Sequence, residues 1–301
     1  MDHGDEVAFT FTNGETRRIT LLETDARVTY TTLDTPKVQQ GGAVTNYEFT
    51  ATLEIDGRQH TLWREVATQR SFYEPWLIDG MAIYLDAVSD IFDFLTEQHG
   101  DCRPRKAARL AIHEADQSIC PDLLHPWCPL PPGGLNITDC YNGEDCWLGA
   151  YFGAAAHGGL DINHPAGVPI FAPFDIDDHE MFNTTYAGQN NNRWRGQHTW
   201  PDGSTWVIQV HHLIGLTDCR EHQPIPAGRQ MARGAGVGVG SHEHSHFVFA
   251  VIEPGQMFED RVLLDPWILF RQMYIDQHGR KGAGHARQET VPSFTPSKVA
   301  R

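Results

Sequence analysis

Residues 241–251 read SHEHSHFVFAV, and this stretch decides how the surrounding chain folds. Three histidines at a spacing of two, followed by an alternating apolar run, predict one β-strand with all three imidazoles on the same face. Neutral imidazole is the commonest metal ligand in proteins, and a strand holds its ligands more rigidly than a loop does. A solvated, histidine-rich strand end would show the same pattern, so a metal site requires further ligands from elsewhere in the chain.

A second candidate ligand pair lies at residues 157–161, which read HGGLD. On a helix, side chains four residues apart lie about 6 Å from each other and could share one metal ion. The two glycines and the INHP run after them oppose a helix, whereas a flat strand would separate the pair by about 13 Å. We therefore expect the chain to bend at Gly158-Gly159, the residues that permit a bend.

Further blocks accompany these two stretches. HGGLDI at 157–162 is followed by PAGVPIFAP at 165–173, VIQVHHL at 207–213, PAGRQMARG at 226–234, HSHF at 244–247 and LDP at 264–266. In content and order they resemble the lysostaphin and LytM type of zinc metalloendopeptidases, whose signature begins H-x-G-x-D-I and P-x-G-x-P-V-x-A. The resemblance covers residues 147–272. It implies a mainly β fold, with a C-terminal antiparallel sheet domain of the duplicated hybrid motif type.

The same resemblance implies a set of site residues. One Zn²⁺ ion would be held by His157, Asp161 and His246, with a fourth position left for water. Two histidines, one carboxylate and water form the ligand set of a catalytic zinc rather than a structural one. His212 and His244 would be the catalytic histidines that are not ligands, and they would share proton transfer and stabilisation of the oxyanion. The sequence does not divide those roles between them.

The histidine strand itself offers two registers for a ligand pair. Either His242 and His244 or His244 and His246 could match the family's H-x-H step. The apolar Phe247, directly after the second pair, matches the family and favours that register. His242 would then lie further along the same face.

Adjacent histidines at 211 and 212 are alternative candidates for one catalytic position. Alternation along a strand points neighbouring side chains to opposite faces, so we expect only one of them to face the site. The following Leu213 matches the family and favours His212. The candidates for contact with substrate or with the ligands are His242, His211, His164, His179, Asn191, Arg193 and Arg195.

Composition narrows the class of protein. A formal charge of −16, from 23 basic and 39 acidic residues, argues against a general binder of nucleic acid or of anionic membranes. No apolar run approaches the roughly 18 residues of a membrane span, and the first residues are not a signal peptide. Six cysteines without a C-x-x-C pair favour disulfides over a thiolate zinc site. We therefore expect a secreted or periplasmic protein in mature form.

The order of elements predicts four parts. Residues 1–118 form a β-rich N-terminal module, with hairpin turns at Asn13-Gly14 and Asp56-Gly57. Apolar residues at three- and four-residue steps predict a helix over 78–98, and a second short helix is expected over 105–115. A connector rich in proline and cysteine spans 119–146, the catalytic domain spans 147–273, and a polar tail spans 274–301. Within the catalytic domain, residues 175–203 read as a long polar loop.

These features lead to one preferred function and two alternatives. The preferred function is a zinc endopeptidase that cleaves peptide bonds in peptidoglycan or in glycine-rich peptides. The first alternative is a metal-dependent enzyme acting on polysaccharides, either a hydrolase or a lyase of uronate polymers, because a metal can neutralise a uronate carboxylate while a histidine removes the adjacent proton. The second is a binding module without catalysis.

Overall fold

The chain is mainly β. The computed structural model describes residues 1–31, 45–66, 74–90, 106–120, 124–132, 134–139, 158–183, 185–186, 189–190, 192–216, 220–234 and 243–279. Antiparallel pairing joins the named strands of every sheet in this part of the chain. The prediction of a mainly β, antiparallel fold is confirmed.

A four-stranded meander forms the N-terminal end of the molecule. Its strands are β1 (Glu6–Thr10), β2 (Thr16–Thr31), β3 (Thr45–Ile55) and β4 (Arg58–Val66), paired in chain order. The turn between β3 and β4 has positive φ at both Asp56 and Gly57, 46° and 81°, as a two-residue hairpin with right-handed strand twist requires. Both predicted hairpins are confirmed.

The predicted helices over 78–98 and 105–115 are wrong where the structure describes them. The residues form a second sheet of β5 (Trp76–Ile78), β6 (Met81–Val88) and β7 (Ala108–Glu114). Every residue of β6 is buried, so apolar side chains on both faces produced spacings that also fit a helical stripe. Asp79-Gly80, with φ of 45° and 84°, is a third hairpin turn that the helix prediction overlooked.

The larger sheet carries the C-terminal half of the chain. Its strand order is β11-β14-β15-β18-β9-β8, with β19 paired to β18. The bounds are β8 (Asn136–Asp139), β9 (Leu160–Asn163), β11 (Asp178–Phe182), β14 (Asn192–Thr199), β15 (Thr205–Leu213), β18 (His244–Ile252) and β19 (Val262–Leu264). The prediction of a long loop over 175–203 is wrong, because β11 and β14 lie within it. The segment predicted as a connector supplies β8 to the sheet.

Smaller elements complete this half. They are the sheet of β10 (Pro169–Phe171), β17 (Gln230–Arg233) and β16 (Gly215–Leu216), the hairpin of β12 (Thr185–Tyr186) and β13 (Gln189–Asn190), the 3-10 turn η3 (Phe258–Asp260) and the helix α1 (Trp267–His278). No helix among the described residues has the length and apolarity to cross a membrane.

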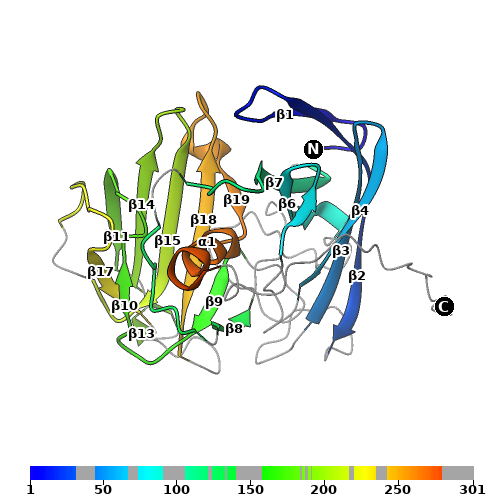
Figure 1. Cartoon of the computed structure of the whole chain (residues 1–301). Helices are drawn as coiled ribbons and strands as arrows, with labels where there is room; N and C mark the ends of the chain where they lie inside the picture. The colour runs from blue at the N-terminus through cyan, green and yellow to red at the C-terminus, as the bar shows by residue number, and fades with distance from the viewer. Residues whose placement is uncertain are drawn as a thin grey trace.

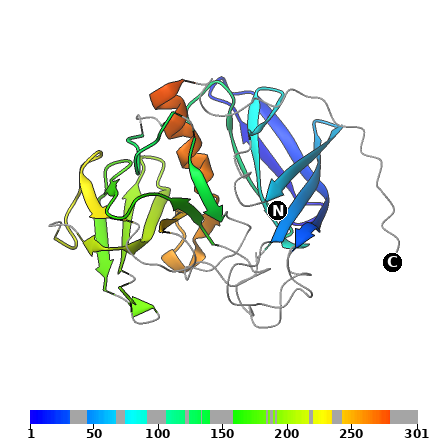
Figure 2. The same ribbon diagram turned by 90° about the horizontal axis from the view of Figure 1, so that it is seen from below.

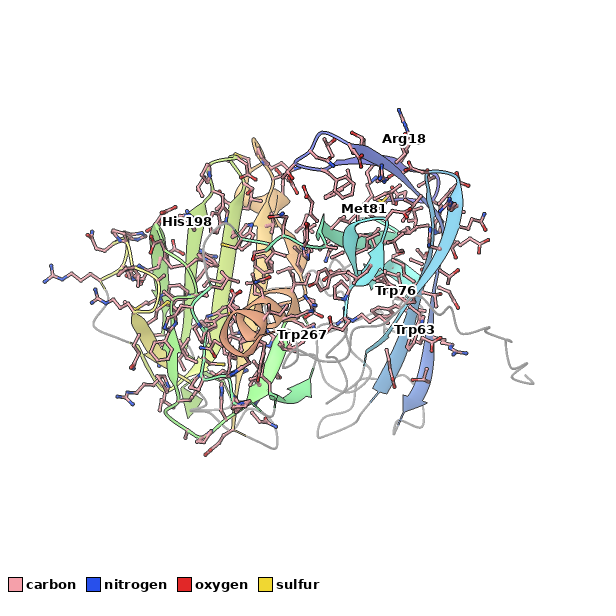
Figure 3. The ribbon with its side chains drawn as sticks, viewed as in Figure 1. Arg18, Trp63, Trp76, Met81, His198 and Trp267 are labelled. Carbon is pink, nitrogen blue, oxygen red and sulfur yellow. The ribbon has the colours of Figure 1, made fainter. Side chains whose placement is uncertain are left out.

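The two halves pack around a shared centre. Figures 1 and 2 show the larger sheet and the four-stranded meander at opposite ends, with β6 and α1 between them. Trp127 stacks on Phe270 of α1 and meets Phe247 of β18 edge to face, with ring centroids 5.6 and 4.9 Å apart. Trp267, Trp76 and Met81, labelled in Figure 3, are buried in the same core. Burial of large aromatic rings supplies much of the hydrophobic stabilisation of such a core.

A buried network of charges also joins the halves. Arg64 of β4 is fully buried and forms an ion pair with Asp265, which lies two residues before the start of α1. Arg64 Nη1 donates to the carbonyl of Asp86 over 2.6 Å, and the Asp265 amide donates to Asp86 Oδ1 over 2.6 Å. Burial raises the pKa of Asp86 to about 7, against the opposing effect of Arg109.

Four of the six cysteines on which the expected disulfides depend lie outside the described residues: Cys102, Cys140, Cys146 and Cys219. Cys120 and Cys128 are both buried and are not bonded to each other. Burial raises the pKa of the Cys128 thiol, which therefore stays protonated and unreactive.

Candidate functional site

The site is built on three adjacent strands at the centre of the larger sheet. His246 of β18 lies directly opposite Asp161 of β9 on one side and His211 of β15 on the other. Residues opposite each other in an antiparallel pair project from the same face, so the register alone brings these side chains together. His244 lies on that face as well, two residues before His246.

Asp161 links the two histidines of β18. His246 Nδ1 donates to Asp161 Oδ1 over 2.8 Å, and His244 Nε2 lies 3.4 Å from Asp161 Oδ2. Only 5% of Asp161 and 1% of His246 is exposed, so this contact is shielded from water. A carboxylate at this depth interacts strongly with its neighbours because water screens it little.

His212 completes the cluster from β15. Its ring centroid lies 4.7 Å from that of His244 and 6.1 Å from that of His246. The ring of His211 lies 4.8 Å from that of His246. Both neighbouring histidines therefore reach the site, and the expectation that only one of them could face it is wrong.

A β-bulge explains why alternation fails here. Asn192 pairs with Leu213 and Trp194 pairs with Val210, so His211 and His212 together oppose the single residue Arg193. A bulge places two residues against one, bends the strand and re-aims a side chain, and such bulges are frequent beside active sites. His212 has a φ of 60°, in the left-handed region that side chains other than glycine seldom adopt.

His211 has a different environment from the other histidines. The side-chain amide of Gln209 hydrogen bonds to its Nε2, which leaves that nitrogen unavailable to a metal ion. Burial, followed by the neighbouring His246 and His212, lowers the pKa of His211 well below its usual range. His211 is therefore neutral near pH 7. Gln209 was not among the predicted site residues, although its spacing of two from His211 places both on one face.

Gly159 allows the chain to pack closely against the ring of His246. A Cβ at this position would come within 2.6 Å of His246 Nε2 and would also collide with the carbonyl of Phe247. Only glycine lets the β9 segment approach the imidazole this closely. The glycine of the H-x-G-x-D-I block is thus required by packing against the ring.

Three predicted site residues, His157, His242 and Asn191, lie outside the described residues. Within the described part, no group of three side chains is arranged to hold a metal ion. Asp161 and His246 nevertheless fit two of the ligand positions. Ligand atoms around a tetrahedral zinc, each about 2.0–2.1 Å from the ion, lie about 3.3 Å apart. Asp161 Oδ1 and His246 Nδ1, now 2.8 Å apart, need move little to reach that spacing.

The remaining candidates divide between the two faces of the sheet. His164 is half-buried with its ring edge to face with that of Phe247, centroids 6.2 Å apart, and burial, with a further contribution from His244, lowers its pKa to about 4. His179 lies on the face away from the cluster, where its ring stacks on Trp194 and its Nδ1 donates to the Gln223 carbonyl over 2.8 Å. Arg193 and Arg195 occupy β14, one strand beyond His211.

Comparison with known proteins gives matches by structure alone. No family model matches the chain, and no curated protein matches it. The solution structure of lysostaphin aligns with 58% of this chain and 62% of its own, at 18% identity and a TM-score of 0.35. The chain thus spans less than two thirds of lysostaphin's length.

Two further solved structures are similar to parts or most of the chain. The catalytic domain of lysostaphin from Staphylococcus simulans aligns over 38% of this chain and 77% of that domain, at 19% identity and a TM-score of 0.28. A zinc-containing peptidase from Vibrio cholerae aligns over 89% of this chain and 84% of its own, at 14% identity and a TM-score of 0.34. Lysostaphin-type peptidases are thus among the structures that this chain resembles, as the motifs predicted. The proposed roles of the residues rest on the geometry of the site itself.

Proposed function

We propose that this chain is a zinc-dependent endopeptidase that acts outside the cytoplasm on peptide bonds of peptidoglycan or of glycine-rich peptides. The observation that carries the proposal is the buried cluster of Asp161, His246, His244 and His212, assembled from three adjacent strands. The resemblance of the motif blocks to the lysostaphin and LytM type of zinc metalloendopeptidases supports the same activity and supplies the substrate class. A protein of net charge −16 gains no long-range attraction to anionic wall polymers, so recognition must be local.

Asp161 and His246 would hold the ion, with His157 as the third ligand. A bound zinc lowers the pKa of water and polarises the carbonyl of a scissile bond. The carboxylate of Asp161 also contacts His244, so it fixes the position of that ring relative to the ion. Because His211 stays neutral, it adds no positive charge beside the ligands.

His244 and His212 would carry out the proton transfers. Their rings meet nearly at right angles, with centroids 4.7 Å apart, and both lie beside the ligand His246. One imidazole can take a proton from the attacking water, and either can donate one to the leaving amine. The protonated ring would also stabilise the oxyanion of the tetrahedral intermediate.

The test combines metal analysis with product analysis. We expect the purified chain to bind one zinc and to release new amino termini from peptidoglycan or glycine-rich peptides. His246→Ala should lose the zinc, whereas His212→Ala should keep it and lose turnover. His222→Ala is the matched control, because this histidine is exposed and pairs with Asp178 away from the cluster.

Two results would contradict the proposal. Unsaturated uronate products without new amino termini would show a polysaccharide lyase instead. Absence of zinc from protein purified without chelator, together with no cleavage after zinc is added, would favour a binding module.

A further inference from the structure

Two arginines stand beside the histidine cluster on β14. Arg195 lies opposite Gln209, and Arg193 lies opposite the bulge formed by His211 and His212. The residue between the arginines, Trp194, is fully buried in the core on the other face of the sheet. By alternation, both arginines therefore project from the face that carries the cluster.

The two guanidinium groups share an aromatic support but differ in their partners. Both stack over Phe182 of β11, at 5.7 Å for Arg193 and 5.3 Å for Arg195. Arg195 forms an ion pair with Glu180 and also stacks over Phe258 at 4.8 Å. Arg193 has neither a hydrogen bond nor an ion pair with any described residue, and its Nε is buried without a partner.

This arrangement is unfavourable for Arg193 without a bound anion. Burial and the like charge of Arg195 both lower its pKa. In a chain with 39 acidic residues, none of the described carboxylates pairs with Arg193. A guanidinium held on an aromatic ring beside a second one is preorganised to bind a planar anion through two parallel hydrogen bonds.

Arg193 is close enough to the cluster to act on the same substrate. Its charge is among the influences that lower the pKa of His211. Neighbouring strands lie about 4.8 Å apart, so the backbones of Arg193 and His246 are separated by two strand spacings, roughly 10 Å. An extended peptide advances about 3.3–3.6 Å per residue, so this distance corresponds to about three residues.

We propose that Arg193, assisted by Arg195, binds a carboxylate of the peptide substrate about three residues from the bond that is cleaved. The proposal rests on the peptidase function above and narrows its substrate class to peptides with a carboxylate at that distance. The carboxylate could belong to an acidic side chain or to a free C-terminus, because a guanidinium recognises both in the same way.

Pairs of matched peptides distinguish an acidic side chain from a free C-terminus as the source of the carboxylate. One pair carries glutamate or glutamine three residues from the scissile bond, and a second pair ends there in a free carboxylate or an amide. With the zinc-loaded full chain, we expect kcat/KM to be at least about tenfold higher for one acidic member than for its neutral match. That preference should decrease with increasing salt, since Arg193 is only partly buried.

Substitutions then test which arginine causes the preference for acidic peptides. Arg193→Gln should reduce the ratio between acidic and neutral peptides to about one, mainly through KM for the acidic member. Arg195→Gln should reduce the ratio less, because Arg195 already pairs with Glu180. Arg18→Gln removes the same charge from a side chain that is 70% exposed on the four-stranded meander (Figure 3), and it should leave the ratio unchanged.

Equal cleavage of acidic and neutral peptides by the unsubstituted chain would overturn the proposal, and so would a preference that survives Arg193→Gln. If no peptide is cleaved, the peptidase function fails by itself. Calorimetric titration of the same peptides into the zinc-loaded chain then tests Arg193 separately. Tighter binding of the acidic member that Arg193→Gln abolishes would support the carboxylate site, and equal binding of both members would overturn it.

Discussion

Two buried polar clusters of this protein differ in how their charges are balanced. Around Asp265, Arg64 and Asp86 connect the N-terminal sheets to the start of α1, and basic side chains oppose acidic ones. Around Asp161, one carboxylate is shared by two imidazoles, and a third imidazole, His211, is held neutral. The first arrangement joins the N-terminal sheets to the start of α1. The second brings a carboxylate and imidazoles, which are groups that bind metal ions, close together. Burial therefore stabilises structure in one place and prepares a site in the other.

The largest expected effect comes from breaking the first cluster. Arg64→Met leaves the carboxylate of Asp265 buried without its partner, which should lower the free energy of unfolding by about 3–5 kcal/mol. Denaturant unfolding of the zinc-free chain measures this loss. Arg27→Met is the control, because the pair of Arg27 with Glu48 is partly exposed and should contribute less than about 1 kcal/mol. Equal losses in the two variants would mean that Arg64 does not hold the halves together.

The second prediction changes the packing of the site and leaves its charge unchanged. Gly159→Ala pushes a methyl group toward His246 Nε2, so zinc affinity should fall about a hundredfold, or about 2.7 kcal/mol. Competition with a chromogenic chelator measures that affinity. Gly234→Ala is the matched control, since its added Cβ would collide with Ser245 on the opposite side of β18. The control should destabilise the fold and keep the affinity for zinc; equal affinities in the two alanine variants would contradict the role of Gly159.

The third effect concerns the pH dependence of the first cluster. Burial raises the pKa of Asp86 to about 7, so the folded chain binds a proton more tightly than the unfolded chain, whose Asp titrates near 3.8. This group therefore stabilises the fold most at low pH, and its contribution decreases as the pH rises from about 4 to about 7. The slope is at most about 1.4 kcal/mol per pH unit.

Asp86→Asn removes that titration and keeps an oxygen that can accept the Asp265 amide. We expect the unfolding free energy of the variant to depend less on pH between 4 and 7 than that of the unsubstituted chain, in parallel denaturant titrations. Identical pH profiles for the two chains would show that Asp86 is already ionised at low pH in the folded state.

The smallest effect tests the neutral imidazole of the site. Gln209→Met removes the hydrogen bond that occupies His211 Nε2, which frees the ring to change its tautomer. Activity should fall about tenfold while the zinc content stays constant, as expected when a group that supports a ligand environment is lost. Loss of zinc from this variant would mean that Gln209 acts through the ligands themselves.

Local sequence patterns determined a large part of this structure. The turns at Asn13-Gly14 and Asp56-Gly57 form where glycine after asparagine or aspartate permits positive φ. The spacing of His244 and His246 placed both rings on one face, and the strand register brought Asp161 opposite the second. These features depend on neighbours along the chain or on motif order, so they can be read from residues alone.

Other features depended on contacts between distant segments. Strand β6 is covered on both faces by other elements, so its uniform burial imitated a helical stripe and led to the wrong helix over 78–98. Polar residues of β11 and β14 gave no alternation, because β11 is defined by its pairing with β14, and β14 by its pairing with β15. The bulge at His211 and His212 arises where β14 and β15 pair out of step, and it places both rings in the site. The sequence by itself determined which residue types supply the chemistry, whereas only the tertiary structure decided that Arg193 stands beside them, because that position depends on how the strands pair.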